Sequence, residues 1–148
     1  DEMFILLTAA YFHDAGFLFK YQSNEPDAAK LAREVLPEMD YTQEEIKEIC
    51  KIILATDIKV QPNTLLEKIM CDADHDYFGR EGYSQTADNL RKELEEYGTS
   101  FEDKEWLEVQ INFLEEKHQY YTETSKLSRI PNKNKIIAAL KVALINSI

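Results

Sequence analysis

Apolar side chains recur along the chain at the three- and four-residue spacing of amphipathic helices. Between Leu6 and Phe12 nearly every residue is apolar, so we expect a helix there that is buried on most sides, with Gly16 marking where the chain leaves it. Capping boxes, other capping residues and prolines near helix starts predict where the later helices begin. These helices are expected at about 24–36, 42–57, 64–77, 84–97, 100–118 and 134–145.

The pattern predicts an all-α, single-domain helical bundle of about six to seven helices that spans residues 1–148. A hydrophobic content of 44% allows a sizeable core, and only 4 glycines and 4 prolines favour helix over sheet. The chain has no initiator Met and begins almost directly in a core helix. We therefore expect the domain to be incomplete at its N-terminus.

The net charge of the chain limits the classes of partner that it can bind. A net charge of −11 argues against binding to nucleic acid polymers and to anionic membrane surfaces. Every charged residue in 126–148 is basic, so this segment either docks against the acidic body or meets an anionic ligand. No apolar run reaches the length of a membrane span, and two buried free thiols, Cys50 and Cys71, suit a reducing compartment such as the cytoplasm.

His13 and Asp14 stand at the inner end of the apolar N-terminal helix. Burial of an imidazole and a carboxylate costs desolvation energy that either a bound cation or hydrogen bonds of a core histidine would offset. A second polar cluster follows at 72–76, where a helical wheel places Asp74 closest to the apolar face set by Leu66 and Met70. His75 and Asp72 are expected to face solvent, and a solvated acidic face remains the alternative for the cluster.

These polar residues, in this order, resemble those of the HD superfamily of metal-dependent phosphohydrolases. That all-helical family is named for a His…His-Asp…Asp metal site, and its last ligand commonly lies in an Asp-Ala-Asp-type segment, which Asp74 matches. The wider text, from about Leu6 to Thr124, looks like a small bacterial branch of the family. The segments that carry the likeness are Phe-His-Asp-Ala-Gly-Phe, Ala-Arg-Glu-Val-Leu-Pro, Ile-Leu-Ala-Thr, Cys-Asp-Ala-Asp-His-Asp-Tyr-Phe-Gly-Arg and Glu-Trp-Leu.

The resemblance implies that His13, Asp14 and Asp74 bind a divalent metal ion (Mn, Fe, Zn or Mg), with Asp14 and Asp74 also catalytic. The family's first His lies on an upstream helix, and nothing of that helix precedes Asp1. Some relatives use further histidines for a second metal, and this chain has none at those positions, although Glu25 or Asp57 could supply an oxygen. The implied activity is hydrolysis of a phosphomonoester or phosphodiester in a nucleotide or other small phosphorylated compound.

Four more residues are candidates for substrate binding or catalysis. Lys20 and Arg80 are cations that could bind the substrate phosphate, or ordinary surface charges. Tyr77 could stack on a nucleobase, or belong to the core. His118 lies on the apolar side of its predicted helix and is either a catalytic proton donor and phosphate contact or a hydrogen-bonded core histidine.

Two other classes of function stay open. One is a catalytically inactive helical module that binds or regulates a partner, which the missing first His supports. The other is a purely structural helical adaptor, which predicts no metal. Whether the chain forms a homo-oligomer is left open by the sequence.

Overall fold

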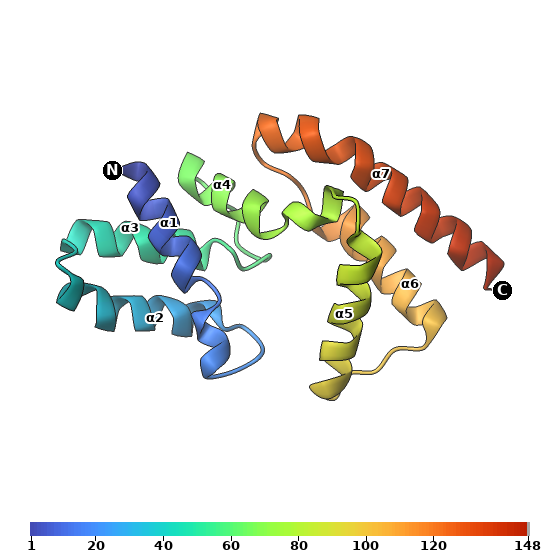
Figure 1. Ribbon diagram of the computed structural model, residues 1–148, viewed down its shortest axis with the longest axis horizontal. Coiled ribbons are helices and arrows are strands. Elements are labelled where there is room, and N and C mark those ends of the chain that lie inside the picture. Colours follow the sequence, from blue (N-terminus) through green and yellow to red (C-terminus); the bar gives the residue numbers. More distant parts are fainter. Residues whose placement is uncertain (148) are drawn as a thin grey trace. The chain divides into compact units, whose positions relative to one another are not determined.

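The computed structural model describes residues 1–147, and within them the chain is entirely helical, with no strand (Figure 1). The seven α-helices are α1 (Glu2–Phe12), α2 (Glu25–Val35), α3 (Gln43–Leu54), α4 (Leu65–Asp74), α5 (Tyr83–Glu96), α6 (Asp103–Asn112) and α7 (Glu123–Asn146). Three short 3₁₀ helices, η1 (Ala15–Leu18), η2 (Leu36–Met39) and η3 (Asp76–Gly79), and a π-helical turn, η4 (Phe113–Lys117), connect them. The all-α fold class is confirmed, whereas the likeness to the HD type stays a prediction.

The chain divides into two compact units, Asp1–Asp74 and His75–Ile148. The predicted organisation as a single domain remains a prediction. Among residues 1–147, no helix combines the length and apolarity needed to cross a lipid bilayer.

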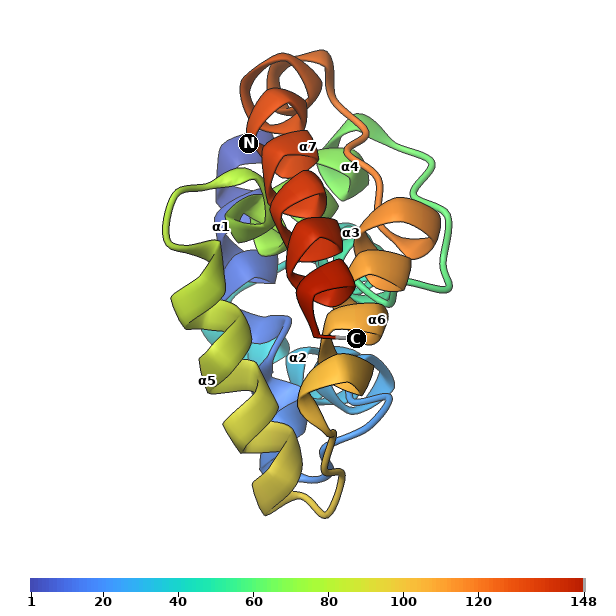
Figure 2. The ribbon, with the colours of Figure 1, turned by 90° about the vertical axis from the view of Figure 1, so that its right-hand side faces the viewer.

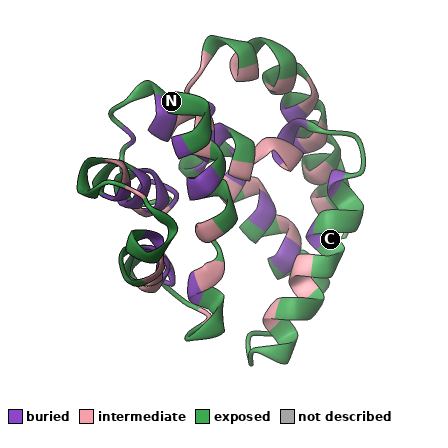
Figure 3. Ribbon diagram, turned by 60° about the vertical axis from the view of Figure 1, so that its left-hand side comes forward, coloured by how far each residue is buried: buried purple, intermediate pink, exposed green. Residues whose placement is uncertain are grey.

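The first unit is organised around α3, against which α1, α2 and α4 all pack. Three fully buried alanines of α2 let its backbone approach α3 closely. Figure 3 shows the buried residues of α2 and α3 gathered on one side of each helix. The thiols of Cys50 and Cys71 are free and buried, as expected, and each donates to a backbone carbonyl.

Two predicted helix starts are confirmed by their hydrogen bonds. Thr42 and Glu45 form a reciprocal capping box at α3, in which each side chain accepts from the backbone N–H of the other residue. Thr64 and Glu67 do the same at α4, with N···O distances of 3.2 Å in both directions. Each pair satisfies N–H groups that the first helical turn leaves unpaired.

The second unit contains α5, α6 and α7 around a core of aromatic and aliphatic side chains. α7 lies along α6 and also contacts η3 (Figures 1 and 2). Gly79 permits this second contact, because a Cβ at this position would lie 2.6 Å from the carbonyl oxygen of Arg129. The amide of Asn132 donates to the Gly79 carbonyl at 3.2 Å, and the side chains of Arg129 and Asp76 pair across the same contact.

The last two predicted helices differ from those observed. α7 begins at Glu123, where Thr122 caps it, and continues through Pro131, so the expected start near Asn134 is wrong. A proline inside a helix removes one backbone hydrogen bond. Here Arg129 and Asn132, on either side of Pro131, both contact η3, and these contacts keep the helix continuous through the proline. The helix predicted to reach His118 ends at Asn112, and after the π-helical turn His118 is extended.

The expected exposure of Asp72 and His75 is also wrong. Asp72 is only 4% exposed, because α4 is buried on more than the single apolar stripe used for the wheel. α4 ends at Asp74, so the helical geometry does not extend to His75, whose ring packs against Phe78, Phe113 and His118.

Candidate metal centre at His13, Asp14 and Asp74

The ends of α1 and α4 place the three predicted metal ligands together in the first unit. His13 immediately follows α1 and is its C-terminal cap, since its backbone N–H donates to the carbonyl oxygen of Ala9 with an N···O distance of 2.9 Å. Asp14 begins the turn into η1, and Asp74 is the last residue of α4, which contacts α1. All three side chains are thus held at helix ends.

The imidazole of His13 lies between the two carboxylates. Its Nε2 atom is 3.3 Å from Oδ2 of Asp14 and 3.5 Å from Oδ1 of Asp74. Its Nδ1 atom is 2.8 Å from the carbonyl oxygen of Ala10, and because a carbonyl only accepts, Nδ1 carries a hydrogen. The Ala10 contact therefore fixes the ring so that Nε2 is the atom offered to Asp14 and Asp74.

This setting raises the pKa of His13 from 6.5 to about 9. The hydrogen bond with Asp74 contributes most, and the Ala10 contact and the charges of both aspartates add to it, while burial of the ring opposes it. The imidazole is consequently protonated at neutral pH unless a cation takes the place of the proton on Nε2.

The donor types fit a divalent transition metal, since one imidazole nitrogen and carboxylate oxygens are typical ligands. Neighbouring donors of a tetrahedral ion with bonds of about 2.1 Å lie about 3.4 Å apart, close to both distances from Nε2. Among residues 1–147, however, no group of three or more His, Cys, Asp and Glu side chains is already arranged to hold a metal ion. The described residues thus offer a partial donor set.

The turn after Asp14 depends on Gly16. A Cβ there would lie 1.9 Å from the carbonyl oxygen of Asn24, so the close approach of these two backbones requires glycine. Asn24 is itself buried, and two oxygens in this region, Oδ1 of Asn24 and Oε2 of Glu25, are buried without a hydrogen bond from the described residues. Asn24 directly precedes α2, but its side chain makes no capping hydrogen bond there.

Lys20, the predicted phosphate-binding cation of the first unit, is half-exposed. Its Nζ atom pairs with Oδ2 of Asp27 at 2.9 Å. An exposed pair of this kind contributes little to stability, so the ammonium can exchange Asp27 for another anion at small cost.

Arg80 and Tyr77 lie in the second unit. Arg80 pairs with Asp76, which also pairs with Arg129. Burial alone would raise the pKa of Asp76, but the hydrogen bonds from the two arginines outweigh it and lower the pKa. The ring of Tyr77 packs against that of Phe78, with the two ring centroids 4.2 Å apart.

The basic segment from residue 126 onward largely pairs within the second unit. Lys126 pairs with Glu123 at 2.8 Å, Lys141 with Glu115 at 2.6 Å, and Nζ of Lys133 donates to the carbonyl of His118 at 2.8 Å. Only the Lys141 contact reaches an acidic side chain outside α7, because Glu123 lies on the same helix as Lys126 and Lys133 meets a carbonyl. Both expectations for this segment stay predictions.

His118 also lies in the second unit and is 4% exposed. Aromatic rings of Phe78 and Tyr120 surround it, and neither ring nitrogen has a hydrogen-bond partner among the described residues. Burial, together with the charge of Lys133 and the nearby His75, lowers its pKa from 6.5 to about 3. The ring is enclosed as expected of a core histidine, but the hydrogen bond of that alternative is absent among the described residues, and the catalytic role stays a prediction.

The structure therefore brings together His13, Asp14 and Asp74. Lys20 belongs to the same unit and pairs with Asp27, while Tyr77, Arg80 and His118 belong to the second unit. A nitrogen and two carboxylates at one point can hold a cation, accept a proton from water, or form a closed ion pair. No protein-family model, no curated protein and no solved structure matches the chain.

Proposed function

We propose that the chain is a metal-dependent phosphohydrolase that acts on a nucleotide or another small phosphorylated compound. One observation carries the proposal: Nδ1 of His13 is fixed on the Ala10 carbonyl, and Nε2 is turned towards Asp14 and Asp74. A histidine whose second nitrogen binds a backbone carbonyl is the common arrangement of metal-binding imidazoles.

In this proposal His13, Asp14 and Asp74 bind a divalent ion, which when present lowers the pKa of water and polarises a phosphoryl oxygen. Asp14 has the most exposed side chain of the three, at 64%, and its carboxylate is suited to accept a proton from the attacking water. Asp74, at 26%, is the more enclosed ligand and orients His13.

The substrate phosphate needs positive charge in a chain whose net charge is −11. Lys20 is the cation of the first unit proposed for this purpose, since its weak pair with Asp27 is readily exchanged. Tyr77, Arg80 and His118 are proposed as substrate-binding and catalytic residues from the sequence, and the resemblance supports Arg80 and His118 in addition.

The alternative is an inactive helical module that keeps the fold. It is favoured by the ion pairs themselves: protonated His13 compensates Asp14 and Asp74 without a metal, as the raised pKa indicates. In that case, a metal ion could bind only by displacing the proton on Nε2 of His13, which the raised pKa makes harder to remove.

Hydrolysis assays separate the two. The chain would be incubated with Mn²⁺, Zn²⁺ or Mg²⁺ and with p-nitrophenyl phosphate, bis-p-nitrophenyl phosphate and a panel of nucleotides. Asp74→Asn, which keeps the side-chain shape, should lower kcat/KM by at least about 100-fold, a loss typical of removing one electrostatic group at a reacting centre. The exposed Asp88→Asn should leave kcat/KM unchanged. Activity that survives in Asp74→Asn would reject the proposed site, and no activity with any metal would reject the enzyme in favour of the module.

A further inference from the structure

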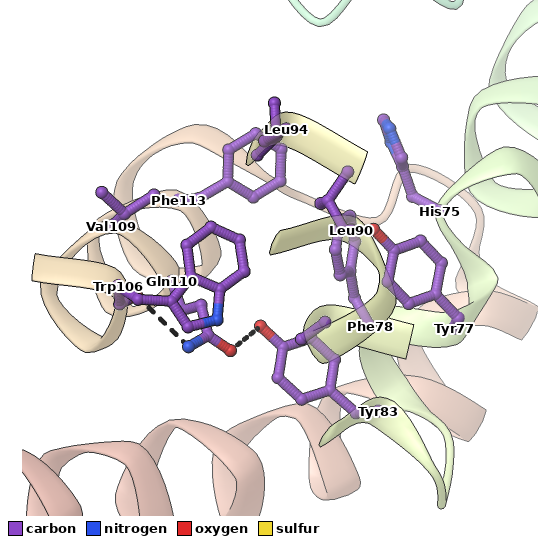
Figure 4. A pocket seen from close by; sticks show the side chains of 11 residues that line it. His75, Tyr77, Phe78, Tyr83, Leu90, Leu94, Trp106, Val109, Gln110 and Phe113 are labelled. Atoms are coloured by element: carbon purple, nitrogen blue, oxygen red, sulfur yellow. Dashed lines mark hydrogen bonds between the residues drawn. The ribbon is translucent and has the colours of Figure 1, made fainter. Parts of the chain in front are cut away.

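The second unit contains a pocket of about 300 Å³ that none of the proposed metal ligands lines and that shares only Tyr77 with the proposed hydrolase residues. α5, α6, η3 and η4 enclose it, and Figure 4 shows its side chains converging from these elements. Aromatic rings dominate its walls, namely those of His75, Tyr77, Phe78, Tyr83, Trp106 and Phe113. Apart from His75, none of the described residues that line it is acidic or basic.

The polar groups of the pocket are few and neutral. The hydroxyl of Tyr83 donates to Oε1 of Gln110 at 3.1 Å, and Nε2 of Gln110 donates to the backbone carbonyl of Trp106 at 3.2 Å (Figure 4). Tyr83 and Gln110 are 7% and 8% exposed, so both polar groups are held in place inside the fold.

Trp106 supplies an unused donor. The residue is 6% exposed, yet no described group accepts a hydrogen bond from its Nε1–H. A buried donor without an acceptor is costly, and most indole N–H groups in protein interiors find a partner. The indole ring forms part of the pocket wall, and its Nε1–H is covered by the side chains around it. A molecule in the pocket satisfies this donor by displacing part of that cover.

We infer that this pocket binds a neutral, planar, fused-ring heteroaromatic compound that carries a ring-nitrogen or carbonyl acceptor for the Trp106 indole. The aromatic walls favour a flat π-system, the scarcity of charged side chains favours a neutral ligand, and the volume suits two or three fused rings. The inference does not rest on the metal site, because every residue that lines the pocket lies in the second unit, whereas His13, Asp14 and Asp74 lie in the first.

Quinoline and naphthalene are the probes. They have nearly the same shape, but only quinoline carries an acceptor. Trp106 is the single tryptophan of residues 1–148, so this chain gives one indole N–H peak in a ¹H–¹⁵N spectrum. We expect quinoline to move this peak downfield saturably and to bind about fivefold more tightly than naphthalene, the effect of one neutral hydrogen bond.

Two substitutions locate the binding. Val109 lines the pocket and is 40% exposed, so Val109→Phe should fill the pocket without disturbing the core and abolish the saturable shift. Val142→Phe, at a 58% exposed valine of α7 outside the pocket, is the matched control and should bind normally. In Trp106→Phe, followed by ligand-observed saturation-transfer NMR, the preference for quinoline should disappear.

Three results would overturn the inference. The first is no saturable shift with quinoline, and the second is equal affinity for the two probes. The third is a peak that moves with protein concentration alone and stops moving in Val109→Phe, which would show that a second copy of the chain occupies the pocket.

Discussion

Nε2 of His13 lies 3.5 Å from Oδ1 of Asp74, although the two residues belong to different helix ends, those of α1 and α4. This contact is the largest cause of the raised His13 pKa. It joins the His-Asp pair to the second acidic cluster of the sequence, and the proposed metal site depends on it.

The first prediction concerns this contact directly. In protein treated with chelator, Asp74→Asn should lower the His13 pKa from about 9 towards 6.5, because the amide gives neither the charge nor the same hydrogen bond. The pKa is measured by NMR titration of the three histidines, with His13→Gln to assign the peak. Asp88→Asn is the control, and an unchanged His13 pKa in Asp74→Asn would show that the two side chains do not interact.

A second prediction follows from His118. The unfolded chain takes up a proton at this histidine below pH 6.5, whereas the native ring stays neutral down to about pH 3. Unfolding therefore binds a proton in this window, and the free energy of unfolding falls as the pH decreases from 6.5 towards 3, by up to about 1.4 kcal/mol per pKa unit.

His118→Leu removes this titration and should flatten the loss of stability with acid. Trp106 fluorescence follows the unfolding of the second unit, because the only tryptophan lies in its core. Parallel pH profiles for the wild type and His118→Leu would contradict the neutral, buried state of the ring.

A third prediction tests the turn after Asp14. Gly16→Ala places a Cβ into the Asn24 backbone and should cost about 3 kcal/mol or more, the upper range for overpacking. Gly82→Ala is a useful comparison, because a Cβ there meets nothing within 4 Å and only its φ of 88° is unfavourable, a cost of about 1–2 kcal/mol. Denaturant unfolding followed by circular dichroism gives both values. Equal costs would mean that the Asn24 contact is absent.

A fourth prediction concerns the contact between η3 and α7. Arg129→Met keeps much of the side-chain volume but removes the partly buried pair with Asp76, and should lower the free energy of unfolding by about 1–3 kcal/mol. Lys126→Met breaks only the exposed pair with Glu123 and should change it by less than about 1 kcal/mol. Trp106 fluorescence reports both, and similar losses in the two variants would argue against a special role for Asp76.

The helix pattern of the first unit could be predicted because its signals are local. Capping boxes at Thr42 and Thr64 and the apolar stripe of α3 depend on residues three or four positions apart. The meeting of His13 with Asp74 was expected only through the resemblance, since no local pattern relates residues so distant in the chain.

The second unit was predicted less well because tertiary contacts outweigh local signals there. Pro131 normally indicates a helix boundary, yet the contacts of Arg129 and Asn132 with η3 keep α7 continuous. The π-helical turn before His118 changes the direction of that side chain, which no periodicity reveals. The unsatisfied indole of Trp106 is likewise visible only once its surroundings are known.

The central claim is that His13, Asp14 and Asp74 bind a divalent metal ion. The most direct measurement is elemental analysis of the purified chain after incubation with Mn²⁺ or Zn²⁺ and removal of free metal, beside Asp74→Asn and Asp88→Asn. The account predicts stoichiometric metal in the wild type and in Asp88→Asn, and little in Asp74→Asn. A wild-type chain without metal, or equal metal in all three proteins, would contradict it and leave the His13 cluster as an ion pair.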